Sequence, residues 1–312
     1  MNNLDIQYQQ LMLDIMTNGV EKEDRTGTGT ISVFGRQIRH DMSKGFPLLT
    51  TKKMAVKTMM TELKWFLKGD TNIKYLVDNG CNIWNGDAYK KYEKYAMDNS
   101  YGVDILSMDE FIEQIKTDNQ FAKKWGELGP IYGRQWRDWY AGGHQEYIGD
   151  TLVDMEYNSV DQISNLIEQL KTNPDSRRIM VNAWNVAELD QMTLPPCHYG
   201  FQCYVADGKL SLMWNQRSVD TFLGLPFNIA SYGALLLLLC DETGYKPGEL
   251  VGNLGDVHLY KNHIDQANEQ CGRKSYDLPS IELSNVDVLK GEFEYEIIGY
   301  ESHPSIKAPL SN

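Results

Sequence analysis

The segment Leu225 to Cys240, which reads LPFNIASYGALLLLLC, decides the fold of this chain. From Ile229 onward it is almost wholly apolar, as expected for a helix that is buried on all sides. Its continuous apolar run, Leu235 to Cys240, is far shorter than the roughly 20 residues that a membrane-spanning helix needs. We therefore expect a core helix and no membrane span.

Segments on both sides of this helix alternate between strand and helix patterns. Asp207 and Gly208 form a hairpin turn signal between two strand-like segments. The expected strands are 31–40, 179–184, 201–205, 209–214 and 293–298, and the expected helices are 4–16, 55–67 and 163–170. Hairpins mixed with long helices predict an α/β (α+β) fold, with a mixed, mainly antiparallel sheet covered by helices.

The region from Tyr89 to Trp125 differs in composition, with clustered Lys, Tyr, Asp and Glu and few apolar runs. Ser107 followed by Glu110 is a typical helix start. Since no repeat or flexible linker interrupts the chain, we expect a single domain over residues 1–312 with an inserted helical lobe at about 88–126.

The composition of the chain argues against several classes of function. The formal net charge of −13 argues against loose binding to DNA or to anionic membranes, which depends on basic surface. The five cysteines form no CxxC pair, and the N-terminus does not resemble a signal peptide. We expect a cytoplasmic protein with no DNA or membrane partner, in which any anionic ligand meets a local group of arginines.

Cys197 is a candidate nucleophile. Pro195 and Pro196 precede it and His198, a possible proton partner or cationic neighbour, follows it. Nearby positive charge lowers the pKa of a thiol and so populates the reactive thiolate. A lone cysteine is nevertheless more often inert, and a cysteine hydrolase using Cys197 with His198 or His258 is a rival, although no oxyanion-hole signature supports it.

Arginines near small and hydroxylated residues are candidates for binding an anion. They are Arg25 in a glycine-bearing turn, the pair Arg177 and Arg178, and Arg217 beside Ser218. Guanidinium groups match phosphate oxygens bidentately, although a single arginine more often makes a surface ion pair. His258 and Tyr260 would project from one face of a strand, and we expect no metal site.

Taken together, these segments resemble the thymidylate synthase family from Leu4 to Pro309. The motifs that carry the resemblance are DRTGTG at 24–29, FPLLTTKK at 46–53, LPPCH at 194–198, QRSVD at 216–220, LGLPFNIASY at 223–232 and GDVHLY at 255–260. Their joint occurrence in order is highly specific, and it outweighs the structural alternatives given above for single residues.

The resemblance implies reductive methylation of dUMP to dTMP, with 5,10-methylenetetrahydrofolate as the source of both carbon and hydride. Cys197 would add to carbon 6 of uracil and turn the ring into a nucleophile at carbon 5. A dUMP hydroxymethylase on the same scaffold, in which water completes the reaction, remains an alternative. A nucleotide-binding protein without activity is disfavoured because Cys197, Glu62 and the arginines are all present.

The resemblance also assigns site residues. The catalytic set is Cys197, Glu62, Tyr132, His198, Asn228 and Asp220. The dUMP set is Arg25, Arg177, Arg178, Gln216, Arg217, Ser218, Asp220, Asn228, His258 and Tyr260. The folate set is Lys52, Trp84, Asp220, Leu223, Gly224 and Phe227. Arg177 and Arg178 would reach the phosphate of the neighbouring subunit, which implies a homodimer joined through the sheet.

The chain departs from the family pattern in three places. Asn85 and the two residues after it replace a second aromatic wall of the folate pocket, which Tyr89 or Trp125 of the lobe could supply. The C-terminus ends in polar residues rather than in a small apolar tripeptide. Trp214 and Asn215 stand where Leu and Tyr are more typical.

Overall fold

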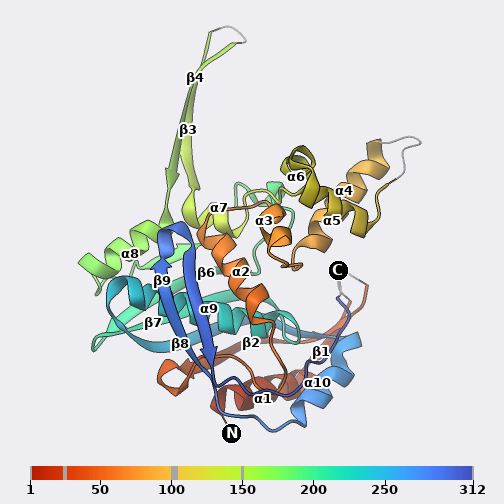
Figure 1. Cartoon of the computed structure of the whole chain (residues 1–312), viewed down its shortest axis with the longest axis vertical. Coiled ribbons are helices and arrows are strands. Elements are labelled where there is room, and N and C mark those ends of the chain that lie inside the picture. Colours follow the sequence, from red (N-terminus) through yellow and green to blue (C-terminus); the bar gives the residue numbers. More distant parts are fainter. Residues whose placement is uncertain (1, 24–26, 100–104, 149–150, 311–312) are drawn as a thin grey trace.

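The structure, a computed structural model, describes residues 2–23, 27–99, 105–148 and 151–310 (Figure 1). Its centre is a six-stranded sheet in the order β1-β2-β8-β7-β6-β5. The strands are β1 (Val20–Lys22), β2 (Thr30–Asp41), β8 (Lys246–Tyr260), β7 (Lys209–Asp220), β6 (His198–Ala206) and β5 (Met180–Asn182). All neighbours are antiparallel except β7 and β8, which run parallel, so the predicted mixed, mainly antiparallel sheet is confirmed.

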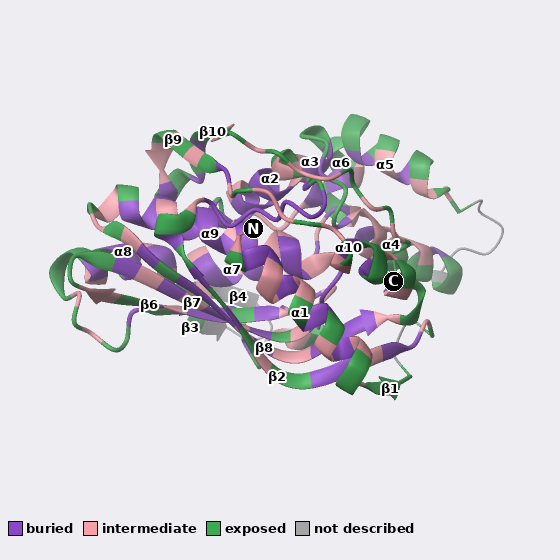
Figure 2. Ribbon diagram, turned by 90° about the horizontal axis from the view of Figure 1, so that it is seen from below, coloured by how far each residue is buried: buried purple, intermediate pink, exposed green. Residues whose placement is uncertain are grey.

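Helices gather on one side of this sheet, and no described helix covers its other face (Figure 2). The main ones are α1 (Asn3–Asn18), α2 (Val56–Leu67), α7 (Tyr132–Arg137), α8 (Gln162–Thr172), α9 (Gly224–Thr243) and α10 (Ile264–Cys271). Short 3-10 turns occur at Met42–Lys44, Leu189–Gln191, Lys261–His263 and Val288–Lys290. The predicted helices at 4–16, 55–67 and 163–170 are confirmed.

The core helix α9 packs against β7 and β8, as its apolar sequence predicts. It is the one described helix that is long and apolar enough to cross a membrane, but 67% of its most apolar window is buried inside the protein. Gly233 lets it lie close to the segment before α2, because a Cβ there would sit 2.4 Å from Pro47 Cγ. The helix thus forms one side of the site described below.

The region predicted as a lobe contains α4 (Asn85–Asn99), α5 (Met108–Thr117) and α6 (Asn119–Trp125), which follow α3 (Ile73–Asp78). Ser107 and Glu110 form the predicted capping box of α5. Aromatic side chains from the three helices pack on one another, among them Tyr89, Tyr92, Phe111, Phe121 and Trp125. Tyr89 and Trp125 therefore belong to the hydrophobic core of this region. The description as one domain with an inserted lobe stays a prediction.

Two hairpins were not predicted in full. β3 (Trp139–Ile148) and β4 (Thr151–Val160) form a hairpin that projects from the body (Figure 1). β9 (Ser280–Asp287) pairs with β10 (Glu292–Ile298), of which only the second was expected. Glycines and charged residues in 139–160 hide the alternation that marks a half-buried strand. By contrast, Asp207 and Gly208 have positive φ (50° and 70°), as the predicted hairpin turn requires.

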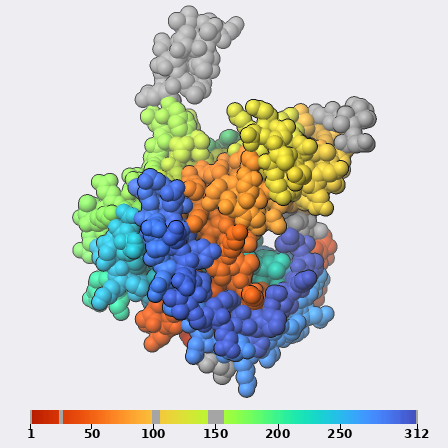
Figure 3. Space-filling view, viewed as in Figure 1, coloured from red at the N-terminus to blue at the C-terminus, as the bar shows by residue number. Residues whose placement is uncertain are grey.

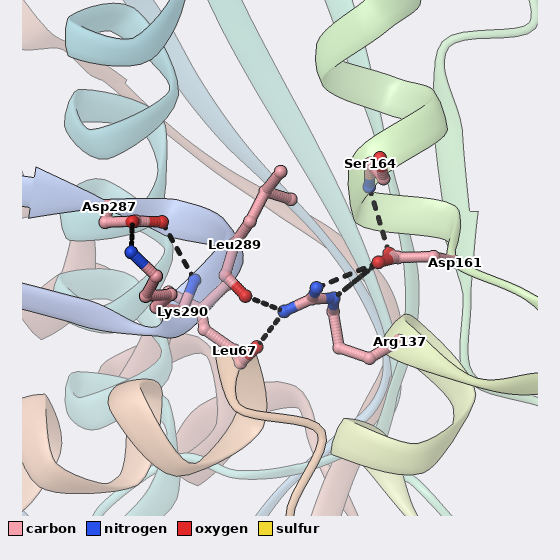
Figure 4. Close-up of polar contacts among 7 residues, drawn as sticks. All are labelled: Leu67, Arg137, Asp161, Ser164, Asp287, Leu289 and Lys290. Atoms are coloured by element: carbon pink, nitrogen blue, oxygen red, sulfur yellow. Dashed lines mark hydrogen bonds and ion pairs between the residues drawn. The ribbon is translucent and has the colours of Figure 1, made fainter.

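Arg137 joins three elements behind the site (Figure 4). Its guanidinium donates to both oxygens of Asp161, whose carboxylate also caps α8 by accepting from Ser164 N. It donates as well to the carbonyls of Leu67, at the end of α2, and of Leu289, between β9 and β10. One side chain therefore holds the ends of α2, α8 and the C-terminal hairpin against α7.

Candidate active site

The site lies on the helix-covered side of the sheet, where α2, α7 and α9 meet the start of β6. Figure 3 shows a hollow between the orange part of the chain and the blue C-terminal segment, with teal residues, near position 200, at its floor. A small cavity is lined by side chains from α2, β6 and α9, including Glu62, His198, Asn228, Ser231 and Tyr232. The cavity brings together residues that lie far apart in the sequence.

Cys197 immediately precedes β6 and is half-buried. Its amide N–H donates to the hydroxyl of Tyr132 at 2.7 Å. The loop before it is held by Arg217, whose guanidinium donates to the carbonyls of Pro195 and Pro196 at 2.9 and 3.0 Å. The backbone on both sides of the thiol is therefore fixed before any ligand binds, as preorganised chemistry requires.

His198 is buried, with its ring stacked on Tyr132 at 4.3 Å between centroids. Its Nδ1 lies 2.9 Å from the hydroxyl of Tyr232. Burial lowers the pKa of His198 to about 3, so the imidazole is neutral at pH 7. The idea that His198 acts as a cationic neighbour of Cys197 is therefore wrong, whereas a role in a hydrogen-bond network stays a prediction.

Glu62, on α2, reaches the same cavity. Trp84 Nε1 donates to its Oε1 at 2.8 Å, and no other hydrogen bond to its carboxyl is seen among the described residues. Burial raises the pKa of Glu62 to about 7, which the bond from Trp84 only partly opposes. A carboxyl group with a pKa near neutrality can take up and release a proton under cellular conditions.

Asn228, near the start of α9, points its amide toward β7. Its Oδ1 accepts from Gln216 Nε2 at 3.1 Å, and the same nitrogen donates to the carbonyl of Ser218 at 3.1 Å. Gln216 in turn accepts from Trp214 Nε1 at 3.1 Å. The predicted dUMP-binding residues Gln216, Ser218 and Asn228 are thus connected through one chain of hydrogen bonds.

Asp220 ends β7 and shapes the turn into α9. Its Oδ1 accepts from the backbone N–H groups of Phe222 and Leu223, both at 3.1 Å. One carboxylate oxygen is therefore used to order the segment in which the predicted folate residues Leu223 and Gly224 lie. Phe227, also predicted, is half-buried on the first turn of α9.

The other predicted folate residues are more deeply buried. Trp84 lies against Tyr132 and Trp65, with ring centroids 6.1 and 5.9 Å away. Lys52 is buried, donates to the carbonyl of Phe222 and lies over its ring, 3.8 Å from the centroid. Burial lowers the pKa of Lys52 to about 7. In this arrangement the ammonium of Lys52 faces Phe222 rather than solvent.

The predicted phosphate residues are more exposed. Arg177 and Arg178 are exposed just before β5, and no ion pair joins either of them to a described residue. Arg217 is exposed on β7, with its guanidinium stacked 5.0 Å from the ring of Trp184. Arg25 lies outside the described residues. The two nearby glycines that are described, Gly27 and Gly29, have the positive φ expected of a glycine-bearing turn.

His258 and Tyr260 lie on β8, and their rings meet at 5.4 Å. The parallel register places His258 opposite Asp220 of β7. The strand alternation used to pair them is therefore confirmed, and they stand beside the predicted base-binding strand. No group of three or more His, Cys, Asp or Glu side chains that could hold a metal was found in the part of the chain that the structure describes.

Sequence reasoning gave no role to several residues that the structure brings into the site. Tyr232 meets His198, Trp136 and Ser231 line the cavity, and Trp214 starts the hydrogen-bond chain to Asn228. Ser231 and Tyr232 lie inside the motif at 223–232, which was the available signal. The contacts of Trp214 arise only when β7 packs on α9, so no local pattern could reveal them.

These features define an enzyme site on an α/β fold: a cysteine with a fixed backbone, followed in sequence by a buried histidine that shares a cavity with a protonatable carboxyl and an ordered amide. The thymidylate synthase family model matches residues 6–312. A thymidylate synthase of Mycoplasma mobile is 50% identical over 98% of this chain and 99% of its own length. Those of Staphylococcus haemolyticus and Listeria monocytogenes are 46% and 45% identical, over 100% and 98% of this chain and 99% of each relative.

The chain therefore belongs to the thymidylate synthase family, which confirms the sequence-based prediction. The similarity extends across the lobe and the projecting hairpin, because the aligned regions cover almost the full length of each protein. The relatives' shared name does not favour the hydroxymethylase alternative.

Proposed function

We propose that this protein converts dUMP to dTMP by reductive methylation, with 5,10-methylenetetrahydrofolate as co-substrate and dihydrofolate as second product. Family membership over nearly the whole chain supports the reaction type. The observation that carries the assignment of roles is the meeting of Glu62, His198 and Asn228 around one buried pocket, with His198 next in sequence to Cys197 and stacked on Tyr132, whose hydroxyl accepts from Cys197 N.

In this proposal the Sγ of Cys197 bonds to carbon 6 of uracil, and the electron pair of the ring double bond moves toward carbon 5 and the oxygen on carbon 4. Asn228 stabilises the developing charge by donating to that oxygen. Carbon 5 then attacks the one-carbon unit, and the electron pair of the attacked carbon–nitrogen bond passes to the folate nitrogen. That nitrogen leaves once carbon 5 has lost its proton, and transfer of hydride to the resulting methylene group expels Cys197. The proton on carbon 5 must leave before Cys197 can be expelled, and the hydroxyl of Tyr132, held by Cys197 N, is the group we assign to assist.

Glu62 is the proposed proton shuttle. Its carboxyl lines a cavity that also contains Asn228 and His198, and the cavity is close to the size needed for a single water molecule. A carboxyl with a pKa of about 7 can protonate the oxygen on carbon 4 through such a water and later recover the proton. The neutral His198 and Tyr232 would orient the same network.

The folate supplies the one-carbon unit and the hydride. The residues present fit a flat, partly apolar ligand, since Leu223 and Phe227 are half-buried apolar side chains, Asp220 orders the turn that carries Leu223, and Trp84 is held by its bond to Glu62. A closed apolar wall also excludes water, which favours hydride transfer over hydroxymethylation. We assign no role in folate binding to Tyr89 or Trp125.

We also propose a homodimer formed through the open face of the sheet. That face exposes large side chains, including Phe34 (82% exposed), Tyr204 (67%) and Met180 (54%), which a monomer would leave in water. Arg177 and Arg178 lie next to this face without described ion pairs and would bind the partner's dUMP phosphate. A reducing, cytoplasmic location fits the cysteines, none of which forms a disulfide in the described part of the chain.

One experiment tests the reaction. The purified protein is incubated with dUMP and methylenetetrahydrofolate, while dihydrofolate is followed by absorbance and the pyrimidine product by mass. We expect dTMP and dihydrofolate in equal amounts. Hydroxymethyl-dUMP without dihydrofolate would overturn the proposal in favour of the hydroxymethylase, and no product from a folded protein would overturn both.

A further inference from the structure

Trp214 lies where the family pattern typically has Leu, and its indole is completely buried. It stacks on Tyr232 of α9 at 5.4 Å with an angle of 7° between the rings. On the other side it faces Gly252 of β8, where a Cβ would come within 2.4 Å of the indole. Because a glycine makes room for it, the ring is wedged in one orientation.

That orientation aims the indole N–H at Oε1 of Gln216, 3.1 Å away. An indole nitrogen can only donate, so Gln216 must present its oxygen to Trp214. A second group agrees with this assignment, because the carbonyl of Ser218 can only accept and lies 3.1 Å from Nε2 of Gln216. The orientation of the Gln216 amide is therefore fixed from both ends.

The fixed orientation of the Gln216 amide determines the orientation of the Asn228 amide. Nε2 of Gln216 donates to Asn228, which must turn its Oδ1 toward Gln216 and its Nδ2 toward the pocket. The hydrogen-bond direction thus passes from a group that can only donate, through two amides, to the residue that meets the base.

We propose that Trp214 is a positioning residue that sets base specificity in this protein by fixing the hydrogen-bond direction of the Gln216 and Asn228 amides. This inference rests on the proposed function, since it assumes that a pyrimidine nucleotide binds against Asn228. Uracil presents an oxygen at carbon 4 and an N–H at position 3, which match Nδ2 and the second lone pair of Oδ1 of Asn228.

Cytosine presents the reverse pattern, with an amino group at carbon 4 and an acceptor at position 3. To match it, Asn228 must turn over and place its Nδ2 against Nε2 of Gln216. Gln216 must then turn as well, which sets one donor against the Trp214 N–H and one acceptor against the Ser218 carbonyl. Leaving buried polar groups unpaired is costly, so the tryptophan makes the cytosine arrangement unfavourable.

The test compares nucleotide binding without folate, by calorimetry with dUMP and with dCMP. Trp214→Phe retains the stacking on Tyr232 and loses only the N–H. We expect the preference for dUMP, the ratio of the two dissociation constants, to fall about tenfold, which corresponds to roughly 1.4 kcal/mol, the scale of one buried hydrogen bond. Trp65→Phe is the matched control, because Trp65 is also buried but donates to the carbonyl of Asn72 instead.

A loss of packing alone would lower the melting temperature of both variants and leave the dUMP preference unchanged, and that result would refute the inference. Gln216→Met provides a second test, which can be used even if Trp214→Phe does not fold. It should reduce the preference for dUMP at least as much as Trp214→Phe does. When both variants fold, adding Trp214→Phe to Gln216→Met should change the preference by less than twofold, because both act through one chain of bonds. Independent, additive effects would contradict the inference.

Asn228→Asp separates this inference from the proposed function. It should shift binding from dUMP toward dCMP, because the carboxylate can accept from the cytosine amino group. If Asn228→Asp shifts the preference and neither Trp214→Phe nor Gln216→Met does, only the role of Trp214 fails. If the unmodified protein binds neither nucleotide, the proposed function fails first.

Discussion

The two ends of the proposed nucleotide site are built differently. At the pyrimidine end, Glu62, His198 and Gln216 are buried and each is hydrogen-bonded to another side chain of the same chain. At the phosphate end, Arg177 and Arg178 are exposed and no described ion pair holds them. The pyrimidine end is thus ordered by contacts within one chain, whereas at the phosphate end the arginines are open to the proposed partner subunit.

The difference follows from what each end must do. Charge that develops during a reaction is stabilised best by dipoles that are already in place and shielded from water. A phosphate dianion carries its charge before it binds, so flexible guanidinium groups can collect it from solution. Arg217 belongs to both ends, because it lies near the proposed phosphate site and also holds the loop before Cys197.

Replacing Cys197 by Ser should have the largest effect on turnover, because it removes the nucleophile. The rest of the pyrimidine end would stay intact. We expect turnover to fall at least about 10³-fold, since a serine hydroxyl is a far weaker nucleophile than a thiolate. The dissociation constant for dUMP should change less than about threefold, because the amides and arginines that bind the nucleotide remain. Normal turnover of the variant would refute the assignment of the nucleophile.

Replacing Glu62 by Gln should lower turnover by about 10²- to 10³-fold, the usual contribution of a general acid or base. Stability provides a separate readout. The folded protein holds the Glu62 proton up to a pKa of about 7, against 4.5 for the ordinary side chain. Between these two pKa values the folded state binds more protons than the unfolded state. The free energy of unfolding should therefore fall as pH rises from about 4.5 to 7.

That decline should amount to about 3 kcal/mol for this one residue, taking 1.36 kcal/mol per pKa unit. The decline should be absent from Glu62→Gln, whose amide has no proton to lose in this pH range. The difference in unfolding free energy between the unmodified protein and Glu62→Gln should therefore change across the range. Urea unfolding at pH 5 and pH 7.5 measures it. A constant difference between the two proteins would show that Glu62 ionises normally.

Arg178→Ala tests the open end. The variant alone should lose about tenfold in dUMP affinity, since one charged hydrogen-bonding partner of the phosphate is removed. The sharper test mixes Arg178→Ala with Cys197→Ser after reversible dissociation, at a dUMP concentration where Arg178→Ala alone is inactive. If Arg178 acts across the interface, each mixed dimer has one intact site, and random mixing restores about a quarter of normal activity.

No recovery from a mixture that contains mixed dimers would place Arg178 in its own subunit's site, whereas normal dUMP affinity of Arg178→Ala alone would remove it from the site. Cys197→Ser mixed with Glu62→Gln is the control. In the proposed site one chain supplies both residues, so mixed dimers contain no intact site and should stay inactive. The two mixtures together therefore separate the end made by one chain from the end proposed to need two.

The same contrast explains what the sequence could predict. Helices α1, α2, α8 and α9 and the hairpin turn at Asp207 follow from apolar spacing and turn residues, which are local signals. Cys197, Asn228 and His258 were found through ordered motifs. The neutral state of His198 and the burial of Lys52 against Phe222 depend on which side chains surround them after folding. No pattern in 139–160 marked its hairpin.

Arg137→Lys should have the smallest effect on activity, because the Arg137 side chain does not itself line the cavity and, among the described residues, bonds only to Asp161, Leu67 and Leu289. Its fork satisfies Asp161 and two backbone carbonyls at once, which a single ammonium cannot reproduce. We expect a loss of about 1–3 kcal/mol in unfolding free energy. Lys171→Ala, which breaks the exposed ion pair of Lys171 with Glu242, should cost less than about 0.5 kcal/mol.

Well below its melting temperature, Arg137→Lys should retain turnover and dUMP affinity within about twofold of the unmodified protein, because neither end loses a group that contacts the ligand. A tenfold fall in turnover with unchanged dUMP affinity would instead mean that the ends of α2 and α8 tune the position of Glu62. In that case the pyrimidine end would depend on the scaffold behind it, and its preorganisation would extend at least as far as Arg137.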